Sequence, residues 1–463
     1  MARDAVSERR AAGKNAREAV PRKTHAEWRP PAGRADPVGI LERQAETRVA
    51  ELLPIRYGRM LQSPFAFFRG AAAIMAADIA ATPRSGFVTQ LCGDAHLSNF
   101  GGFAGPDREL LFDLNDFDET LPGPWEWDVK RLGASLAVAG RNAGLGSRQR
   151  RVEVEAAARA YRKAMRDFAA MGNLDVWYSR LRADDILATL RGRGGKPAAR
   201  DVKHRMAKAR TKDRLHAFAK LTRRVDGTLA LISDPPLVVP ARELLPERDA
   251  TALAGAIDTI LRDYTASLRP DLRGVVESYQ PLDVARKVVG VGSVGTRDWV
   301  VLMVGRDESD PLFLQVKEAP PSVLQAHLGR GRYANQGRRV VEGQRLMQAA
   351  GDLLLGWIRT ASIDGVERDF YVRQLWDWKY SVEIEALDAD QLAGYAGLCG
   401  WTLARAHART SDRVAIAAYL GAGDSFDKAL AKMAEAYADT NDSDHEALVH
   451  AVRTGRIQAD TSV

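Results

Sequence analysis

Two short polar segments in the first third of the chain constrain its fold more than any other feature. The first contains Asp94 and, five residues later, Asn99. A glycine-rich turn and an apolar stretch separate it from a second segment that holds Asp113, Asp116 and Asp118. This order predicts a loop, a strand and an acidic turn. Because Asp and Asn also favour ordinary turns by bonding their own backbone, the pattern needs support from elsewhere in the chain.

The spacing is typical of sites that transfer phosphoryl groups. In protein kinases, an Asp of the catalytic loop accepts the proton of the acceptor hydroxyl, an Asn five residues later binds one Mg²⁺, and an Asp-Phe turn binds another. These roles correspond here to Asp94, Asn99 and Asp116, with Asp118 as a further candidate metal ligand. Whether Asp113, Asp116 or Asp118 is the first metal ligand stays open.

A G-x-G-x-x-G pattern lies further along the chain and consists of Gly290, Gly292 and Gly295, with Ser293 between them. In dinucleotide-binding proteins this pattern opens a helix. Here it is followed by a run rich in Val and Trp, which favours a strand. A glycine loop between two antiparallel strands, with Lys317 near the end of the third strand, is the kinase arrangement for holding nucleotide phosphates.

The remaining parts of a kinase follow in rotated order. Apolar residues recur at helical spacing over 338–349, and Glu342 on this predicted helix is a candidate partner of Lys317. A strand candidate at 370–375 occupies the place of a hinge, and a long helix at 392–407 comes last instead of preceding the catalytic loop. The sequence therefore predicts a circular permutation, which can preserve a core because chain ends often lie close together at the surface.

On these motifs, the chain resembles a large bacterial family of unknown function whose members look like circularly permuted relatives of the aminoglycoside and choline kinase-like fold. The most specific segments are 93–101, 112–120 and 290–296; residues 54–60 and 63–70 also look like family sequence. The resemblance covers residues 40–420. It implies a two-lobed α+β kinase-like fold that uses ATP and Mg²⁺, with the residues in the roles given above, and it implies no particular substrate.

His96 marks a departure from ordinary protein kinases, because it follows Asp94 instead of preceding an Arg-Asp pair. The acidic turn also reads Asp-Phe-Asp, and both departures favour small-molecule or atypical kinases. The Asp94-x-His96 pair opens the two-metal phosphoesterase signature as well, but the other histidines include no Gly-Asn-His and no His-x-His. His96 is therefore assigned to the catalytic site, where it is predicted to support the loop through hydrogen bonds.

Composition is typical of a cytoplasmic bacterial enzyme. The 463 residues include two cysteines, Cys92 and Cys399, which match no metal-binding spacing and favour a reducing compartment. No apolar run approaches the roughly 20 residues that span a bilayer, so no membrane partner is expected. Residues 1–39 carry many charges and few large apolar side chains, and they are predicted to form a mobile basic extension.

The net charge of +7 is unevenly distributed, since residues 191–224 hold 13 Lys and Arg against two acidic residues. Leu215, Phe218 and Leu221 recur there at helical spacing, which predicts an amphipathic helix with a solvated basic face. Such a segment can also face an acidic or phosphorylated partner. With Phe218 as its single aromatic residue, it lacks the stacking residues of nucleic acid binders, so nucleic acid is not the expected partner.

The predicted organisation is a helical large lobe over 40–281, a β-rich small lobe over 282–385, and helices over 386–463 that complete the large lobe. The expected function is ATP- and Mg²⁺-dependent phosphoryl transfer to a hydroxyl acceptor that the sequence does not identify. Two alternatives remain at this point. The chain could be a nucleotide-binding regulatory pseudokinase, or it could transfer a nucleotidyl group to a protein if the nucleotide bound in the reverse direction.

Overall fold

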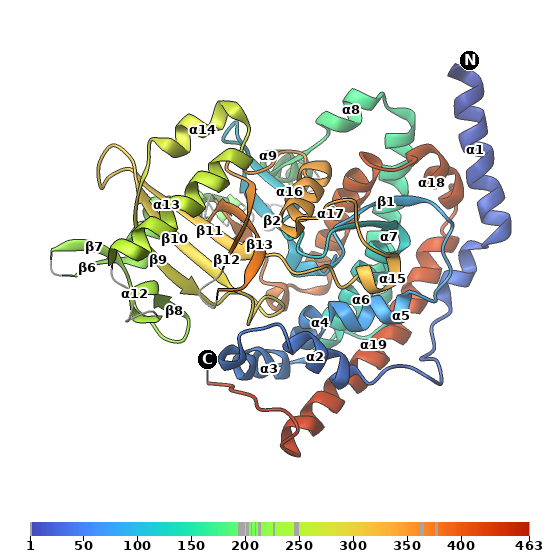
Figure 1. Ribbon diagram of the computed structural model, residues 1–463. Helices are drawn as coiled ribbons and strands as arrows, with labels where there is room; N and C mark the ends of the chain where they lie inside the picture. The colour runs from blue at the N-terminus through green and yellow to red at the C-terminus, as the bar shows by residue number, and fades with distance from the viewer. Residues whose placement is uncertain are drawn as a thin grey trace.

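The computed structural model describes residues 2–192, 200, 203–204, 206–208, 210–211, 214–225, 227–244, 250–361, 365–375 and 378–462. Over these residues the chain is α+β, as the sequence predicts. In Figure 1 a large antiparallel sheet with its covering helices lies on one side, and long helices lie on the other, with strand β2 near the junction.

Six strands form the large sheet, in the order β12-β13-β11-β10-β9-β8, and every neighbouring pair is antiparallel. Their bounds are β8 (Val238–Pro240), β9 (Gln280–Lys287), β10 (Asp298–Val304), β11 (Pro311–Glu318), β12 (Gly356–Ala361) and β13 (Glu367–Gln374). Strand β11 is buried along its whole length, in keeping with its run of large apolar residues.

Helices cover both faces of this sheet. Val301 and Met303 of β10 pack against Tyr264 of α13 on one face, whereas Val300 and Leu302 pack in the α11 cluster on the other, as strand alternation requires. The covering helices are α11 (Arg214–Leu221), α12 (Ala241–Leu244), α13 (Ala250–Ser267) and α14 (Pro270–Glu277). Helices α11, α12, α13 and α14, which lie in the range predicted to belong to the large lobe, therefore pack on the sheet.

Helix α16 (Gln336–Met347) lies in the connection between β11 and β12, after the short helix α15 (Gln325–Leu328). It begins at a side-chain cap, where Asn335 accepts a hydrogen bond from the backbone N–H of Arg338 at 2.8 Å. Its first turn lies directly against β13, because a Cβ at Gly337 would be 2.0 Å from the Phe370 carbonyl oxygen. Glycine at this position allows the helix to approach the sheet closely.

Three smaller sheets complete the β-structure, in the orders β1-β4, β14-β2-β3-β5 and β6-β7. The strands are β1 (Val88–Leu91), β2 (Phe100–Ala104), β3 (Leu110–Leu114), β4 (Leu121–Pro124), β5 (Leu181–Arg182), β6 (Thr222–Val225), β7 (Thr228–Leu231) and β14 (Tyr380–Ser381). The β2–β3 hairpin directly follows the 3₁₀ turn η3 (Leu97–Asn99). It returns the chain to this turn, where the Asn115 backbone N–H donates to the Asn99 carbonyl oxygen at 2.9 Å.

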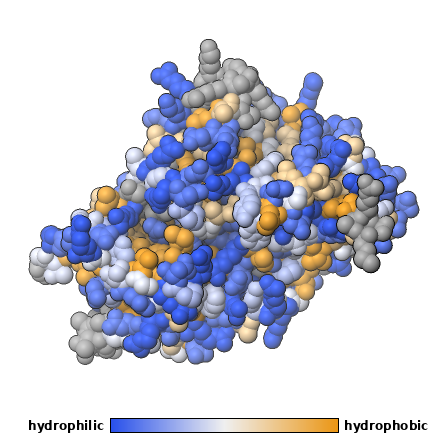
Figure 2. Space-filling model, turned by 90° about the horizontal axis from the view of Figure 1, so that it is seen from above, coloured by the Kyte–Doolittle hydropathy of each residue, from blue (hydrophilic) through white to orange (hydrophobic). Residues whose placement is uncertain are grey.

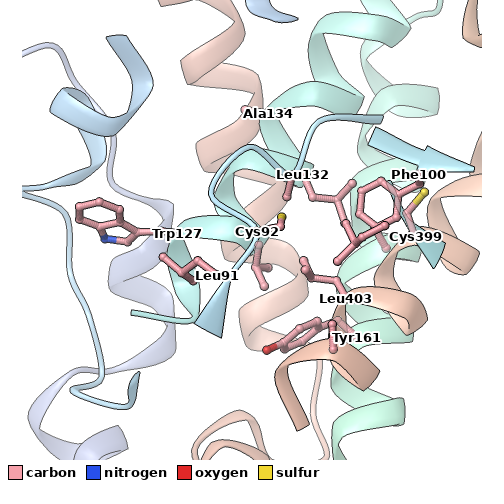
Figure 3. Packing of buried hydrophobic residues seen from close by; sticks show 14 of the residues in the cluster. Leu91, Cys92, Phe100, Trp127, Leu132, Ala134, Tyr161, Cys399 and Leu403 are labelled. Atoms are coloured by element: carbon pink, nitrogen blue, oxygen red, sulfur yellow. The ribbon is translucent and has the colours of Figure 1, made fainter. Parts of the chain in front are cut away.

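Long helices from both halves of the chain form the main core. They are α6 (Glu126–Asn142), α7 (Ser147–Ala170), α17 (Ala389–Ala408), α18 (Arg413–Leu420) and α19 (Ser425–Arg453), joined by the shorter α8 (Asn173–Tyr178), α9 (Ala183–Gly192) and η4 (Ile384–Ala386). Trp125 is fully buried and stacks on Tyr161 with ring centroids 5.5 Å apart. Figure 3 shows Cys92 in this cluster near Leu132 and Leu403. Trp125, Trp127 and Cys92 belong to the core.

The N-terminal segment is ordered and packed, contrary to the predicted mobile extension. Arg9 pairs with Asp412 at 2.8 Å, and the Arg17 Nε donates to the Tyr419 carbonyl oxygen at 2.8 Å. Arg9 therefore contacts the start of α18 and Arg17 its end. The last carbonyl groups of a helix have no hydrogen-bond donor within the helix, and Arg17 supplies one. The elements of this segment are α1 (Ala2–Ala19), η1 (Arg22–Ala26), α2 (Pro37–Ala45), η2 (Ala50–Leu52), α3 (Leu53–Leu61), α4 (Pro64–Gly70) and α5 (Ala72–Ile79).

The last described residues pack against α3. The Asp460 backbone N–H donates to the Pro54 carbonyl oxygen at 2.8 Å. At Gly58, a Cβ would lie 1.7 Å from the Asp460 carbonyl oxygen, so the two backbones are in direct contact. Ile457 adds an apolar contact in the cluster that includes Tyr57.

Part of the basic segment 191–224, namely 193–199, 201–202, 205, 209 and 212–213, lies outside the described residues. Within the described part, Leu221 of α11 is buried, whereas Leu215 is 53% exposed, so the predicted apolar stripe is only partly buried. The view from above in Figure 2 shows mainly hydrophilic residues with scattered hydrophobic ones. In the part of the chain that the structure describes, no helix has a stretch long and apolar enough to cross a bilayer.

A buried salt bridge connects the two sides of the molecule. Arg405 of α17 contacts the Asp113 carboxylate on β3 and the Met347 carbonyl oxygen at the end of α16. The side chains of Arg405 and Asp113 are 1% and 2% exposed. The second oxygen of Asp113 accepts from the Ala349 backbone N–H at 2.9 Å.

We expect Arg405→Met to lower the free energy of unfolding by about 3–5 kcal/mol, because it leaves the Asp113 carboxylate buried without its cation. The Asp113→Asn/Arg405→Met double variant should recover part of this loss, since it removes both charges. Urea denaturation of the wild type and the two variants measures both effects. Equal stability of Arg405→Met and the wild type would show that the pair does not hold these elements together.

Candidate functional site

The loop that follows β1 is fixed by the first turn of α6. Asp128 accepts hydrogen bonds from the backbone N–H groups of Cys92 and Gly93, at 2.8 and 3.0 Å. The same carboxylate lies 3.2 Å from His407 Nε2, and His407 Nδ1 in turn lies 2.9 Å from the Tyr161 hydroxyl. A buried chain of polar groups therefore determines where the loop begins.

Asp94 is the first side chain that this loop presents to the site. Its Oδ1 accepts from Arg131 Nε at 2.8 Å, and 18% of its side chain is exposed. Burial raises the pKa of Asp94 to about 7, with Arg131 lowering it and Asp116 and Glu119 raising it. A carboxylate with a pKa near neutrality can accept a proton from a reacting group.

The β2–β3 hairpin brings Asn99 and the acidic turn together, where the sequence predicts a single strand between them. The Asn99 side-chain amide donates to the Asp94 carbonyl oxygen at 2.8 Å, which leaves Asn99 Oδ1 without a partner among the described residues. In the acidic turn, Asp116 Oδ1 accepts from the Asp118 backbone N–H at 3.1 Å, and the second oxygen of Asp116 has no described partner. Free amide and carboxylate oxygens of this kind fit Mg²⁺, which takes oxygen ligands.

Asp113 does not belong to this group of oxygen atoms. Its carboxylate is used by Arg405 and by the Ala349 backbone N–H, and its side chain is 2% exposed. Of the three carboxylates considered from the sequence, Asp116 and Asp118 therefore face the site.

Lys317 reaches the acidic turn from the large sheet. Its Nζ contacts Asp118 Oδ2, and the Tyr371 hydroxyl donates to Asp118 Oδ1 at 2.7 Å. Although burial alone would raise the pKa of Asp118, Lys317 and Tyr371 hold it below its usual value. Burial opposes the charge of Lys317 as well, but Asp118 raises the pKa of Lys317 well above its usual value.

The predicted pair between Lys317 and Glu342 is not formed. The ammonium group of Lys317 is occupied by Asp118, whereas Glu342 lies 3.5 Å from Arg345 on its own helix. The sequence identified the helix but not the direction of this side chain.

The glycine loop connects β9 to β10, which are antiparallel neighbours, as the sequence predicts. Gly290 and Gly295 have φ values of +65° and +90°, a region that favours glycine. The loop is held by the N-terminal segment: Arg59 Nη1 donates to the Gly290 carbonyl oxygen at 2.6 Å, and the Val49 backbone N–H donates to the Gly295 carbonyl oxygen at 2.8 Å.

These segments line one cavity of about 120 Å³ between the glycine loop and the loop after β1. Most residues that the sequence assigned to the site line it: Asp94, His96, Asn99, Asp116, Asp118, Gly290, Gly292 and Ser293. Gly295, Lys317 and Glu342 do not, although Lys317 approaches it through Asp118.

His96 does not support the loop through its ring, contrary to the prediction. Its Nδ1 is buried and has no partner within the described ranges, and its Nε2 lies 3.7 Å from Asp94 Oδ2. Burial, together with Arg69 and Arg131, lowers the pKa of His96 well below its usual value, so the ring is neutral.

Across the described residues, no three His, Cys, Asp or Glu side chains form a group that could hold a metal ion.

Sequence reasoning missed the arginines of the site and the role of Asp128. Arg131 follows Asp128 by three residues, a spacing that places both side chains on one face of a helix and could have identified them. Arg56 and Arg69 lie in the segments 54–60 and 63–70, which look like family sequence but suggest no role.

The model of a protein family covers most of the chain. That family is described as an uncharacterized protein conserved in bacteria (DUF2252), and its model matches residues 48–451. The chain belongs to the DUF2252 family. No curated protein and no solved structure matches this DUF2252 chain.

We expect Asp128→Asn to loosen the loop that carries Asp94, because the amide can accept at one oxygen but not at two. Hydrogen exchange at the Cys92 and Gly93 amides should become faster, and the free energy of unfolding should fall by about 1–3 kcal/mol. Asp167→Asn, on the exposed side of α7, is the matched control and should change neither quantity. Unchanged exchange in Asp128→Asn would contradict the anchoring role.

Proposed function

We propose that this protein is an ATP- and Mg²⁺-dependent phosphotransferase that acts on a hydroxyl acceptor. The observation that carries the proposal is the meeting of two motifs in one site. Lys317 and Asp118 are 199 residues apart in sequence, yet their side chains form an ion pair beside the cavity lined by Asp94 and the glycine loop.

The arrangement of the large sheet supports this proposal. Strands β9, β10, β11, β13 and β12 are neighbours in that order in the sheet. In the sequence, α16 lies between β11 and β12. A glycine loop between the first two strands and a lysine on the third are the parts with which a kinase small lobe covers and grips phosphates. We further propose that the fold is kinase-like and circularly permuted, because the segment with Asp94 and Asp116 precedes this sheet.

The residues of the site suit distinct steps of the transfer. Asp94 would accept the proton of the acceptor hydroxyl while the hydroxyl oxygen of the acceptor forms a bond to the γ-phosphorus of ATP. The bond between that phosphorus and its bridging oxygen would break, and ADP would leave. Mg²⁺, when bound, would neutralise phosphate charge, and Asn99 and Asp116 supply the free oxygen atoms suited to hold it. The glycine loop and Lys317 would position the phosphates.

Nucleotide binding is tested by thermal unfolding with Mg²⁺ and ATP together and with each alone. At about 100 times its dissociation constant, a ligand of the folded state adds about 2.7 kcal/mol to its stability. We expect this stabilisation in the wild type and in the surface control Asp167→Ala, but not in Asp116→Ala, which loses a metal ligand. A shift with ATP that needs no Mg²⁺ and persists in Asp116→Ala would remove Asp116 from this role.

Transfer itself is tested with Asp94→Asn, which keeps the size of the side chain and a hydrogen-bond acceptor for Arg131. It should bind Mg²⁺ and ATP like the wild type but lose transfer, because the amide cannot accept the acceptor's proton. The mass of the product after incubation with a panel of hydroxyl acceptors distinguishes the alternatives. A gain of one phosphate supports phosphoryl transfer, and a gain of one nucleotide indicates nucleotidyl transfer. Nucleotide binding without any product indicates a pseudokinase.

A further inference from the structure

Three arginines from the segment before β1 line the cavity beside Asp94. Arg48 follows α2, Arg56 lies on α3 and Arg69 lies on α4. In the described part of the chain, none of the three forms a salt bridge, whereas the neighbouring Arg131 is paired with Asp94. The proposed chemistry of Asp94 and the glycine loop does not use these three cations.

Arg56 is the most deeply buried of the three, with none of its surface exposed. Its Nη2 makes two long contacts, 3.2 Å to Gln44 Oε1 and 3.3 Å to the Gly70 carbonyl oxygen. Its Nε and Nη1 are buried and have no hydrogen-bond partner among the described residues. Burial, together with the positive charge of Arg48, lowers the pKa of Arg56 to about 9, so the guanidinium still carries its charge at neutral pH.

Arg69 and Arg48 place two further cations on the wall of the cavity, which Asp94, Asp116, Asp118, Glu119 and Glu318 also line. The Nε of Arg69 is buried and has no partner in the part of the chain that the structure describes. The side chain lies close enough to Asp94 and His96 to change their electrostatic environment. Arg48 Nη1 donates to the Val294 carbonyl oxygen of the glycine loop. The arginines therefore span the distance between the glycine loop and Asp94.

A buried guanidinium without an anion destabilises a protein, because it has lost its hydration without gaining a counter-charge. The cost is recovered when an anion enters the cavity and accepts the unused N–H groups. The planar fork of arginine matches the oxygen atoms of phosphate, which several arginines can bind together. The buried and unpaired donors thus indicate a phosphate group as the missing partner.

We propose that Arg48, Arg56 and Arg69 bind a phosphate group of the acceptor, so that the substrate is a phosphorylated compound with a free hydroxyl. This inference rests on the proposed phosphotransferase function. Arg69 lies beside Asp94, where the acceptor hydroxyl must bind if Asp94 takes its proton. The nucleotide phosphates have their own partners in the glycine loop and Lys317. Two phosphate-binding regions would therefore flank the proposed base.

Inorganic phosphate is the first probe. It is titrated into the protein without nucleotide, at constant ionic strength, and binding is followed by calorimetry. We expect saturable binding by the wild type and at least tenfold weaker binding by Arg69→Gln. Arg43→Gln removes the same charge from an exposed position on α2 and should bind like the wild type. The proposal is overturned if the wild type does not bind phosphate, or if Arg69→Gln binds it equally well.

Arg56→Met separates a ligand-binding role from a structural one. If Arg56 only supported the fold, its replacement would lower the melting temperature. If Arg56 instead binds an anion, Arg56→Met without phosphate should melt at the same temperature as the wild type or a higher one. The variant should also lose the stabilisation that phosphate gives the wild type. A lower melting temperature with an unchanged phosphate effect would overturn the assignment of Arg56.

A non-hydrolysable ATP analogue with Mg²⁺ distinguishes the source of the phosphate. If inorganic phosphate still binds to the protein saturated with the analogue, the site belongs to the acceptor, as proposed. If the analogue excludes phosphate, the arginines bind the terminal phosphate of the nucleotide, and the phosphorylated acceptor is rejected. If phosphate binds through Arg69 but no nucleotide binds, the anion site stands and the phosphotransferase function fails.

Discussion

The salt bridge between Asp113 and Arg405 is the contact on which the geometry of the site depends. It fixes β3 against α17, and the acidic turn begins directly after β3. Two residues beyond Arg405, His407 of the same helix reaches Asp128, which holds the loop of Asp94. Helix α17 therefore positions both polar segments. Because Arg405 also contacts the carbonyl oxygen of Met347, the last residue of α16, α17 links these segments to the large sheet.

Local sequence patterns predicted those parts of the site that are built from consecutive residues. The glycine loop lies between antiparallel strands, and Lys317 is near the end of β11, because the apolar runs around them have strand character. Asn99 and Asp116 meet because a short hairpin joins them. In each case, the partner lies close in sequence or in the next strand of the sheet, where pattern and spacing are informative.

Contacts between distant segments were not predictable in this way. Residues 1–39 carry few large apolar side chains, which predicts that they do not pack, yet Arg17 binds a carbonyl group 402 residues away. Lys317 pairs with Asp118 and not with Glu342. The sequence could not indicate this, because the direction of α16 relative to β11 depends on packing that no local pattern encodes. The unpaired state of Arg56 is likewise a property of the folded cavity, since a sequence does not reveal which charges are left without partners.

The contact between Gly58 and Asp460 has a consequence for how substitutions far from the cavity can act on it. Helix α3 is in backbone contact with the C-terminal residues on one side and carries Arg56 into the cavity on the other. Any side chain larger than hydrogen at Gly58 would push the helix away from Asp460. Sequence variation on the side of α3 that faces Asp460 is therefore mechanically connected to the placement of a cation inside the protein, and the two positions are constrained together.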